Sequence, residues 1–364
     1  MLNNLIDPAK VKIFSRWLQK YNKFVIIGHV SPDGDAVGST LALCHYLRSK
    51  GKNAMVVMPN AFPDFLKWLP GSEEVVLYRR VSYDHSGQYR VRRIIEKAEV
   101  ICCLDFNALY RINEVGELVK ASKAKKLLLD HHLDPENFAD VIISHPDQSS
   151  TCELLFRFLC DLGHFDEMTV DEASCIYTGM MTDTGGFTYN SCRSDIFYII
   201  SLLLTKGVNK DVIYRKVFNN YTAARFVLQG VVLSSMIYLP EYHTAILTMT
   251  REQQKQYHYI RGDSEGFANI PLAIKDVVFA CFLREDTERD EIKLSFRSVG
   301  NFSCEEVARH FGGGGHKNAS GAEQAGKSLE EVKQAFISLL DEFKEQLEDG
   351  YQAEMESSFA VDKS

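Results

Sequence analysis

The stretch with the highest density of reactive side chains is GHVSPDGDAVGS, residues 28–39 of the 364-residue chain. It places His29, Asp33 and Asp35 directly after the apolar run FVII. Imidazole and carboxylate groups are ligands of divalent cations, and Asp33 and Asp35 point to the same side of an extended loop. Because a helix is expected to begin near residue 36, helix capping explains the two carboxylates equally well.

Similar side chains follow other regular segments. Asp105 follows VICCL, the triplet Asp130, His131 and His132 follows KLLL, and Asp183 follows the helix-like ASCIYTGMMT. Taken singly, each is also explained as a turn or junction residue. Carboxylates gathered at one edge repel one another, however, unless a cation neutralises them. Their occurrence at the ends of several predicted elements therefore favours a metal site.

The types of these side chains indicate which ions would bind. Hard oxygen ligands together with imidazole favour Mn²⁺ or Mg²⁺, with Zn²⁺, Fe²⁺ and Co²⁺ as alternatives. The number of groups is sufficient for two ions. Two divalent cations about 3.5–4 Å apart activate a hydroxide and hold the attacking and leaving oxygens of a phosphoryl transfer. The residues thus predict phosphoryl-transfer chemistry.

The order of apolar runs and helical patterns predicts the fold class, which is α/β. Continuous β-branched and leucine runs alternate with helices in the first half, as in a doubly wound, mostly parallel sheet covered on both faces. We expect this domain over residues 1–190, a helical linker over 191–239 and a smaller α/β domain over 240–345. The aperiodic tail, 346–364, is predicted to be disordered.

Composition and charge exclude several classes of protein. The formal net charge is −8, which disfavours a protein that grips long nucleic acid through a basic surface. No run of eighteen apolar residues predicts a membrane span, and the N-terminus is typical of an amphipathic helix rather than a signal peptide. The nine cysteines are scattered and form no C-x-x-C motif. A reduced, cytoplasmic protein is the simplest interpretation.

Five motifs in this order resemble those of the DHH phosphoesterase family. HVSPDGDAVGS, LDFN, LDHH and TDTGGF are similar to its four successive motifs, and FGGGGHKNASG is similar to the signature of the DHH-associated C-terminal domain. The chain is most similar to the short, two-domain subgroup of nanoRNases and phosphatases of 3′-phosphoadenosine 5′-phosphate (pAp). RecJ-type nucleases of the family are longer and carry an extra nucleic-acid-binding domain.

The resemblance implies a role for each matching residue. One ion would be held by His29 and Asp33, the other by Asp35, His131 and Asp183, and Asp105 would bridge the two. Asp130 would orient a histidine, and His132 would contact the scissile phosphate or protonate the leaving oxygen. The motif at Asp105 continues as FNALYRI, in which the sequence assigns no role to Asn107 or Arg111.

A second group of residues is expected to bind the substrate. Gly313, Gly314 and Gly315 belong to a run of glycines that lets a backbone approach a ligand and expose its N–H groups. A flexible glycine loop with an exposed histidine is the alternative. The resemblance implies that His316, with Arg297, binds the terminal phosphate or the base-proximal end of the substrate. Such a clamp would favour substrates of two to a few nucleotides.

These features lead to three hypotheses of function. The first is a manganese-dependent hydrolase of short oligoribonucleotides (nanoRNA) and pAp, with Mg²⁺ or Co²⁺ as alternative ions. The second is a phosphodiesterase of cyclic di-AMP or its linear product pApA. The third, a nucleotide sensor without turnover, is disfavoured by the complete ligand set. We expect no long duplex nucleic acid and no membrane as partners, and a homodimer is plausible.

Overall fold

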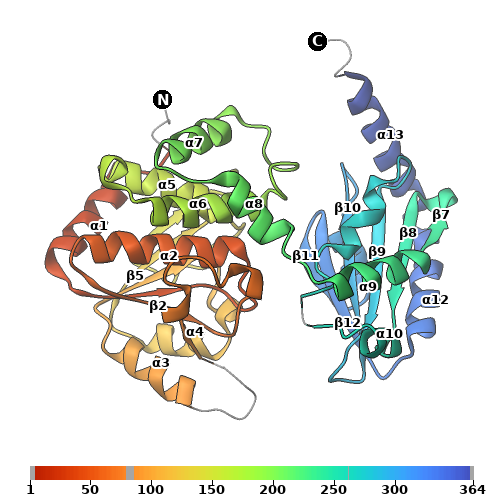
Figure 1. Ribbon diagram of the computed structural model, residues 1–364, viewed down its shortest axis with the longest axis horizontal. Coiled ribbons are helices and arrows are strands. Elements are labelled where there is room, and N and C mark those ends of the chain that lie inside the picture. The colour runs from red at the N-terminus through yellow and green to blue at the C-terminus, as the bar shows by residue number, and fades with distance from the viewer. Residues whose placement is uncertain (1–4, 79–85, 261, 361–364) are drawn as a thin grey trace. The chain divides into compact units, whose positions relative to one another are not determined.

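The computed structural model describes residues 5–78, 86–260 and 262–360 (Figure 1). The chain divides into two compact units, Met1–Asn220 and Tyr221–Ser364. Each unit is built around its own six-stranded sheet. No helix in the described ranges is long and apolar enough to cross a bilayer.

The first unit contains six strands and eight α-helices within its described residues. The strands are β1 (Lys23–Ile27), β2 (Asn53–Met58), β3 (Val76–Leu77), β4 (Val100–Leu104), β5 (Lys125–Asp130) and β6 (Val141–Ser144). The helices are α1 (Pro8–Lys20), α2 (Gly34–Ser49), α3 (Ser86–Glu96), α4 (Glu114–Ala121), α5 (Thr151–Asp161), α6 (Val170–Asp183), α7 (Ser194–Thr205) and α8 (Lys210–Phe218). Figure 1 shows α2, α5 and α6 on one side of the sheet and α3 and α4 on the other.

The sheet of the first unit confirms the predicted doubly wound fold. Its order is β3-β2-β1-β4-β5-β6, and every neighbouring pair is parallel. Phe24 and Ile26 of β1 pack into the core on the α2 side, whereas Val25 and Ile27 pack into the core on the α3 side. The strand order reverses between β1 and β4, and ligands of such sheets bind outside the carboxyl ends of the strands at this point.

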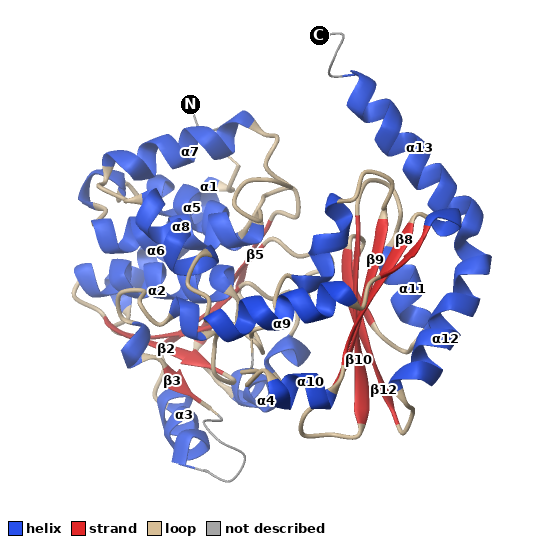
Figure 2. Cartoon of the chain, turned by 45° about the vertical axis from the view of Figure 1, so that its right-hand side comes forward, coloured by secondary structure: helices blue, strands red, loops and turns tan. Residues whose placement is uncertain are grey.

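The second unit has a mixed sheet with helices on both faces. Its strands are β7 (Ile237–Leu239), β8 (Thr244–Met249), β9 (Phe279–Glu285), β10 (Glu291–Ser298), β11 (Gly314–His316) and β12 (Ala319–Ala325), in the order β11-β12-β10-β9-β8-β7. Its α-helices are α9 (Ala223–Ser234), α10 (Arg251–Gln256), α11 (Cys304–His310), α12 (Leu329–Leu339) and α13 (Lys344–Ala360). Figure 2 shows α9 and α10 on one face of the sheet and α11 and α12 on the other.

The predicted linker over 191–239 is not a separate element, so the predicted domain boundaries need correction. Apolar side chains of α7 and α8 are buried in the core of the first unit, and those of α9 are buried against the sheet of the second. β7 is already a strand of the second sheet. The boundary therefore falls after Asn220. The helical pattern was correct, but it does not indicate which sheet covers each apolar stripe.

The predicted disorder over 346–364 is wrong for the described part of this segment. α13 is a helix in which Leu347 is fully buried and the Tyr351 ring stacks on His243, with 4.1 Å between ring centroids. The segment contains Leu347, three Glu and several Gln, Ala and Met residues, which are strong helix formers even where apolar periodicity is weak. The last four residues lie outside the described ranges.

Candidate metal centre

Predicted site residues at the ends of three strands meet at one edge of the first sheet. His29 lies two residues after β1, Asp105 directly follows β4, and Asp130 is the last residue of β5. These strands are consecutive neighbours in the sheet. Their carboxyl ends therefore bring the three side chains to the point where the strand order reverses, which is the usual ligand site of this fold.

Both carboxylate oxygens of Asp105 lie close to histidines, and Oδ1 is also 3.9 Å from His132 Nδ1. Its Oδ2 lies 3.3 Å from His29 Nε2, and its Oδ1 lies 3.7 Å from His131 Nε2. The Asp105 backbone has a φ of 65°, a left-handed conformation that is uncommon outside glycine. Its N–H donates to the Leu129 carbonyl at 3.2 Å, which keeps this residue beside β5. A non-glycine residue in such a conformation is often found at a functional site.

Two helix ends complete the cluster. Asp33 Oδ1 lies 3.7 Å from His29 Nε2, and Asp183 Oδ2 lies 3.2 Å from His131 Nε2. Asp33 also caps α2, because Oδ1 accepts from the backbone N–H groups of residues 35 and 36, both at 3.0 Å. The capping explanation of Asp33 is therefore correct, and the same side chain also belongs to the acidic cluster.

The structure brings all six predicted ligands into overlapping groups. Each group has ligand atoms within 4.8 Å of one another, and the groups are His29–Asp33–Asp105, Asp35–His131–Asp183 and Asp105–His131–His132. The first two groups match the two sets of ligands, one set for each ion, that the resemblance implies. The third adds His132, for which the resemblance implies a role at the phosphate instead.

Asp35 is fully buried and lies at the N-terminus of α5. Its two oxygens accept from the backbone N–H groups of Thr151, at 2.6 Å, and Cys152, at 2.8 Å. The Thr151 hydroxyl donates to Asp105 Oδ1 at 3.0 Å. Burial raises the pKa of Asp35 most strongly, and the charges of Asp105 and Asp33 raise it further. The start of α5 thus fixes two of the predicted ligands.

Backbone carbonyls orient two of the histidines. His29 Nδ1 lies 2.8 Å from the Val30 carbonyl oxygen, and His131 Nδ1 lies 3.2 Å from that of Gln148. A carbonyl only accepts, so Nδ1 carries a proton, and in the neutral rings the Nε2 lone pair is left for a cation that the neighbouring carboxylates would also bind. Histidines that bind metals usually donate their other ring N–H in this way.

Asp130 and His132 form a buried pair beside the cluster. Asp130 is fully buried, and its Oδ1 lies 2.7 Å from His132 Nδ1. Burial alone would lower the pKa of His132, but the hydrogen bond to Asp130 and the charges of Asp105 and Asp130 outweigh it and raise the pKa. Asp130 Oδ2 is buried without a hydrogen-bond partner among the described residues. Asp130 thus fixes the orientation of the His132 ring.

The charges of the cluster fit divalent cations. Burial and the charges of Asp35, Asp33 and Asp105 raise the pKa of Asp183. Burial alone would raise the pKa of Asp105 too, but contacts with the histidines outweigh it and lower the pKa. Gathering these carboxylates in a buried site is costly unless positive charge compensates them. Oxygen and imidazole donors together are the set that Mn²⁺ and similar ions bind.

A buried ion-pair network holds the segment that contacts the cluster, and sequence reasoning missed it. Glu153 Oε2 accepts from the backbone N–H and the hydroxyl of Ser149, at 2.9 and 2.8 Å, and from Arg193 at 2.5 Å. Glu153 Oε1 accepts from Arg157 at 2.8 Å, and Arg193 also binds the Gln148 side chain at 3.1 Å. The only local signal was the i, i+4 spacing of Glu153 and Arg157.

In the second unit, Arg297 and His316 lie on the same face of the sheet. Arg297 of β10 and His316 of β11 are both paired with Ala319 of β12, which lies between them. Laterally paired residues point to the same face, and two strand spacings separate the backbones by about 10 Å. Leu294 and Phe296 alternate with Arg297 and point into the core under α11 and α12. The two predicted substrate residues therefore face away from that core.

The glycine run differs from the flexible loop that was the alternative. Gly314 and Gly315 belong to β11, which pairs with β12. A Cβ at Gly313 would lie 2.1 Å from the Gly321 carbonyl oxygen, and one at Gly315 would lie 2.7 Å from that of Ala319. Close packing against β12 therefore requires glycine at 313 and 315, whereas a Cβ at Gly314 would meet open space.

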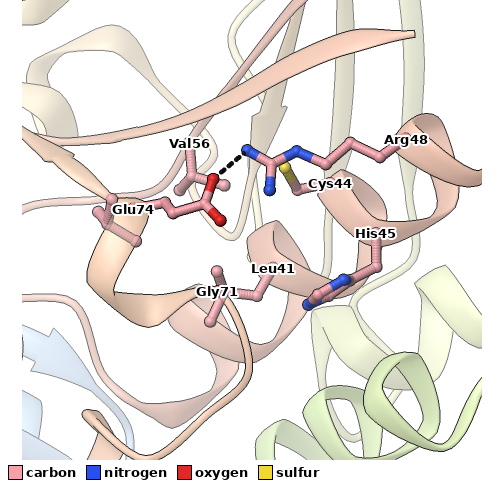
Figure 3. Close-up of a pocket in the computed structure, with 8 residues that line it drawn as sticks. Leu41, Cys44, His45, Arg48, Val56, Gly71 and Glu74 are labelled. Carbon is pink, nitrogen blue, oxygen red and sulfur yellow. Dashed lines mark ion pairs between the residues drawn. The ribbon is translucent and has the colours of Figure 1, made fainter. Parts of the chain in front are cut away.

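A small hollow elsewhere in the first unit contains none of the cluster residues. It lies between α2 and η2 (Ser72–Glu74), is lined by Leu41 and His45 among others, and contains the ion pair of Arg48 with Glu74 at 2.8 Å (Figure 3). The Arg48 side chain is 37% exposed and that of Glu74 is 55% exposed. The pair is thus a surface interaction, unlike the buried pair at Glu153.

Comparison with family models gives two matches that cover most of the chain. Residues 23–180 match the model described as the DHH family, N-terminal domain. Residues 244–346 match the model of the DHHA1 domain. The first range contains almost the whole acidic cluster, and the second contains Arg297 and His316.

Several known proteins are similar to this chain. A Thermus thermophilus protein named bifunctional oligoribonuclease and PAP phosphatase NrnA is 30% identical over 323 residues, 88% of this chain and 89% of that protein. The cyclic-di-AMP phosphodiesterase PdeA of Listeria monocytogenes is 24% identical and matches 92% of this chain but 50% of its own length. The structure of an exopolyphosphatase-related protein from Bacteroides fragilis has a TM-score of 0.91 and 51% identity, and covers 95% of this chain and 100% of that one.

Proposed function

Because the chain belongs to the DHH family and is thus a phosphoric ester hydrolase, we propose that it cleaves short oligoribonucleotides to mononucleotides and pAp to AMP. The relative from Thermus thermophilus, which is similar over nearly its full length, is named for these two activities. The negative charge of the chain also suits short substrates, because a short ligand needs no extended basic groove.

The observation that carries the proposal is the double contact of Asp105. One oxygen faces His29 and the other faces His131, so a single carboxylate belongs to two groups of candidate ligands. This arrangement suits a pair of ions that share one bridging ligand. Two divalent cations, Mn²⁺ by preference and Mg²⁺ or Co²⁺ as alternatives, would supply charge neutralisation at the phosphate and a more acidic attacking water.

Each residue of the site would have its own role in the reaction. One ion would be held by His29 and Asp33. The other ion would be held by Asp35, His131 and Asp183. Asp105 would be a ligand of both ions. His132, held by Asp130 through Nδ1, would present its other ring nitrogen to the phosphate and protonate the leaving oxygen. The α5 N-terminus keeps Asp35 and Asp105 in place through Thr151 and Cys152.

The second unit would bind the end of the substrate that is not cleaved. Arg297 and His316 lie on one face of its sheet, and both side chains can bind a phosphate or a base edge. Gly314 would add a backbone N–H to this surface.

A second candidate function is the hydrolysis of cyclic di-AMP or pApA. The observation that favours it is the similarity to the cyclic-di-AMP phosphodiesterase PdeA over 92% of this chain. The same metal centre would serve both reactions, because the bond that breaks is a phosphate ester in each. The two proposals therefore differ in the binding of the substrate and not in the chemistry.

One rate comparison separates these candidates. The protein with Mn²⁺ is incubated with a labelled five-nucleotide RNA, pAp, pApA and cyclic di-AMP, and initial rates are compared. Fastest turnover of the RNA and pAp is the expected result. Fastest turnover of cyclic di-AMP would select the second candidate, and no turnover of any substrate would refute both and favour a nucleotide sensor.

A further inference from the structure

A short 3-10 turn, η3 (Leu109–Ile112), is held between two loops of the metal centre. On one side, the Arg111 carbonyl accepts from the Val30 N–H at 2.9 Å, next to the first histidine of the cluster. On the other side, the Leu109 N–H donates to Glu136 Oε2 at 2.9 Å, in the loop that follows His132. The backbone of this turn is therefore fixed relative to both loops.

The residue before the turn adds to this bracing. The Asn107 side-chain amide donates to the Leu133 carbonyl at 2.7 Å, and the Asn107 carbonyl accepts from the Glu136 N–H at 2.7 Å. Asn107 thus has a structural role, which the sequence did not assign. Of the two residues to which the sequence assigned no role, Arg111 is then the one whose side chain makes no such contact among the described residues.

The Arg111 side chain is half-buried, and among the described residues it has no hydrogen bond and no carboxylate within ion-pairing distance. Other arginines that are buried to a similar or greater degree have partners. Arg157 and Arg193 bind Glu153, and Arg284 lies over the Tyr259 ring. A guanidinium removed from water normally requires such a partner. The fold therefore provides a positive group at this site without the anion that would satisfy it.

The surroundings of Arg111 indicate where that anion would lie. Arg111 is close enough to His132 for its positive charge to oppose protonation of the imidazole. An arginine whose purpose was to neutralise the acidic cluster would pair with one of the carboxylates, and Arg111 does not. A guanidinium binds the oxygens of a phosphate through two parallel N–H···O bonds, and such bonds are stronger than those of neutral groups.

We propose that Arg111 binds the phosphate group that is hydrolysed, on the His132 side of the metal centre. This inference rests on the proposed function, because it assigns a ligand to the same site. The turn η3 holds the backbone in place, so the guanidinium reaches the phosphate with little loss of backbone freedom. Arg111 is then a substrate-binding residue of the first unit, separate from Arg297 and His316 of the second.

The test compares the Arg111→Gln and Arg111→Lys variants with the wild-type protein, and all three proteins are loaded with Mn²⁺. Two substrates are used, pAp and bis(p-nitrophenyl) phosphate, because the second contains only the phosphate that is cleaved. Arg111→Gln is expected to lower kcat/KM at least about tenfold for both, since a hydrogen bond to a charged group is worth that much or more. Arg111→Lys should retain a higher kcat/KM than Arg111→Gln, because lysine keeps the positive charge but lacks the two parallel N–H groups of a guanidinium.

A binding measurement makes the test independent of turnover. Calorimetric titration of the Mn²⁺-loaded proteins with inorganic phosphate should show at least about fivefold weaker binding for Arg111→Gln, with Mn²⁺ affinity within twofold of wild type. Arg92→Gln on α3 makes the same change at an exposed arginine and should alter neither quantity. If the wild type binds phosphate but turns over no substrate, the proposed function fails and Arg111 is still tested.

Three results would overturn the proposal. One is a kcat/KM of Arg111→Gln within twofold of wild type on both substrates. Another is unchanged phosphate affinity together with a shifted pH profile, which would make Arg111 a residue that tunes His132. The third is a lower kcat/KM of Arg111→Gln for pAp but not for bis(p-nitrophenyl) phosphate, which would place Arg111 at the phosphate that is not cleaved.

Discussion

Replacing Glu153 by glutamine should destabilise the first unit strongly, because its carboxylate is the centre of a buried network. The Glu153 side chain is 0% exposed and that of Arg157 is 4% exposed. Glutamine keeps the size of the side chain but removes the charge and turns an amide NH₂ toward donors. Removing one partner of a buried ion pair costs about 3–5 kcal/mol. Asp195 remains 3.1 Å from Arg157, so we expect about 2–4 kcal/mol here.

The measurement is urea denaturation followed by tryptophan fluorescence. The chain has two tryptophans, Trp17 and Trp68, and both belong to the first unit. The signal therefore reports the unfolding of that unit and not of the second. With an m-value of about 3 kcal/mol/M, a loss of about 3 kcal/mol moves the midpoint by about 1 M urea.

A matched variant on the surface gives the scale for this effect. Glu74→Gln removes the same charge from the exposed pair with Arg48, and exposed pairs contribute about 0–1 kcal/mol. A loss for Glu153→Gln no larger than that of Glu74→Gln would refute the reasoning, because it would show that the buried network carries no net stability. Glu153→Gln should also weaken Mn²⁺ binding. Glu153 fixes Ser149, which lies next to the residues that hold Asp35 and Asp105.

Three further predictions concern the metal centre and the second unit. Asp105→Asn should lower turnover by at least about 100-fold while the circular dichroism spectrum is unchanged, and activity near that of wild type would show that Asp105 is not the shared ligand. Mn²⁺ affinity should rise with pH, because burial and neighbouring charges raise the pKa values of Asp35 and Asp183, and both groups must lose their protons when a cation binds. Proton release on binding is measured by calorimetry in buffers of different ionisation enthalpy. The absence of proton release would contradict this prediction. His316→Ala should raise KM for a dinucleotide about tenfold, whereas His310→Ala on α11 should not, and equal KM values would exclude His316 from substrate binding.

The sequence was sufficient to predict the positions of the strands that deliver the cluster. β1, β4 and β5 each contain an uninterrupted apolar run, so Asp105 and His131 could be placed at strand ends from the local pattern alone. Parallel strands end at one edge, which made it reasonable to group their ligands. The doubly wound fold followed from the same alternation of strands and helices.

The contacts that support the cluster could not be predicted in this way. Thr151 binds Asp35 across 116 positions of the chain, and Arg193 binds Glu153 across 40. Neither pair has a local spacing or a composition that identifies it, because its geometry exists only after the strands and helices have packed. The unused side chain of Arg111 is a similar case, since only the folded structure shows that it has no anionic partner among the described residues.

The pairing of β11 and β12 has a consequence for how this part of the chain can evolve. The two strands are joined by a turn of two residues, Lys317 and Asn318, and Ala319 is the common neighbour of His316 and Arg297. A shift of one residue in a strand moves each of its side chains to the opposite face of the sheet. Substitutions in this hairpin can therefore preserve the shared face, whereas an insertion or deletion of one residue would separate His316 from Arg297. We expect homologous chains to keep a constant length here.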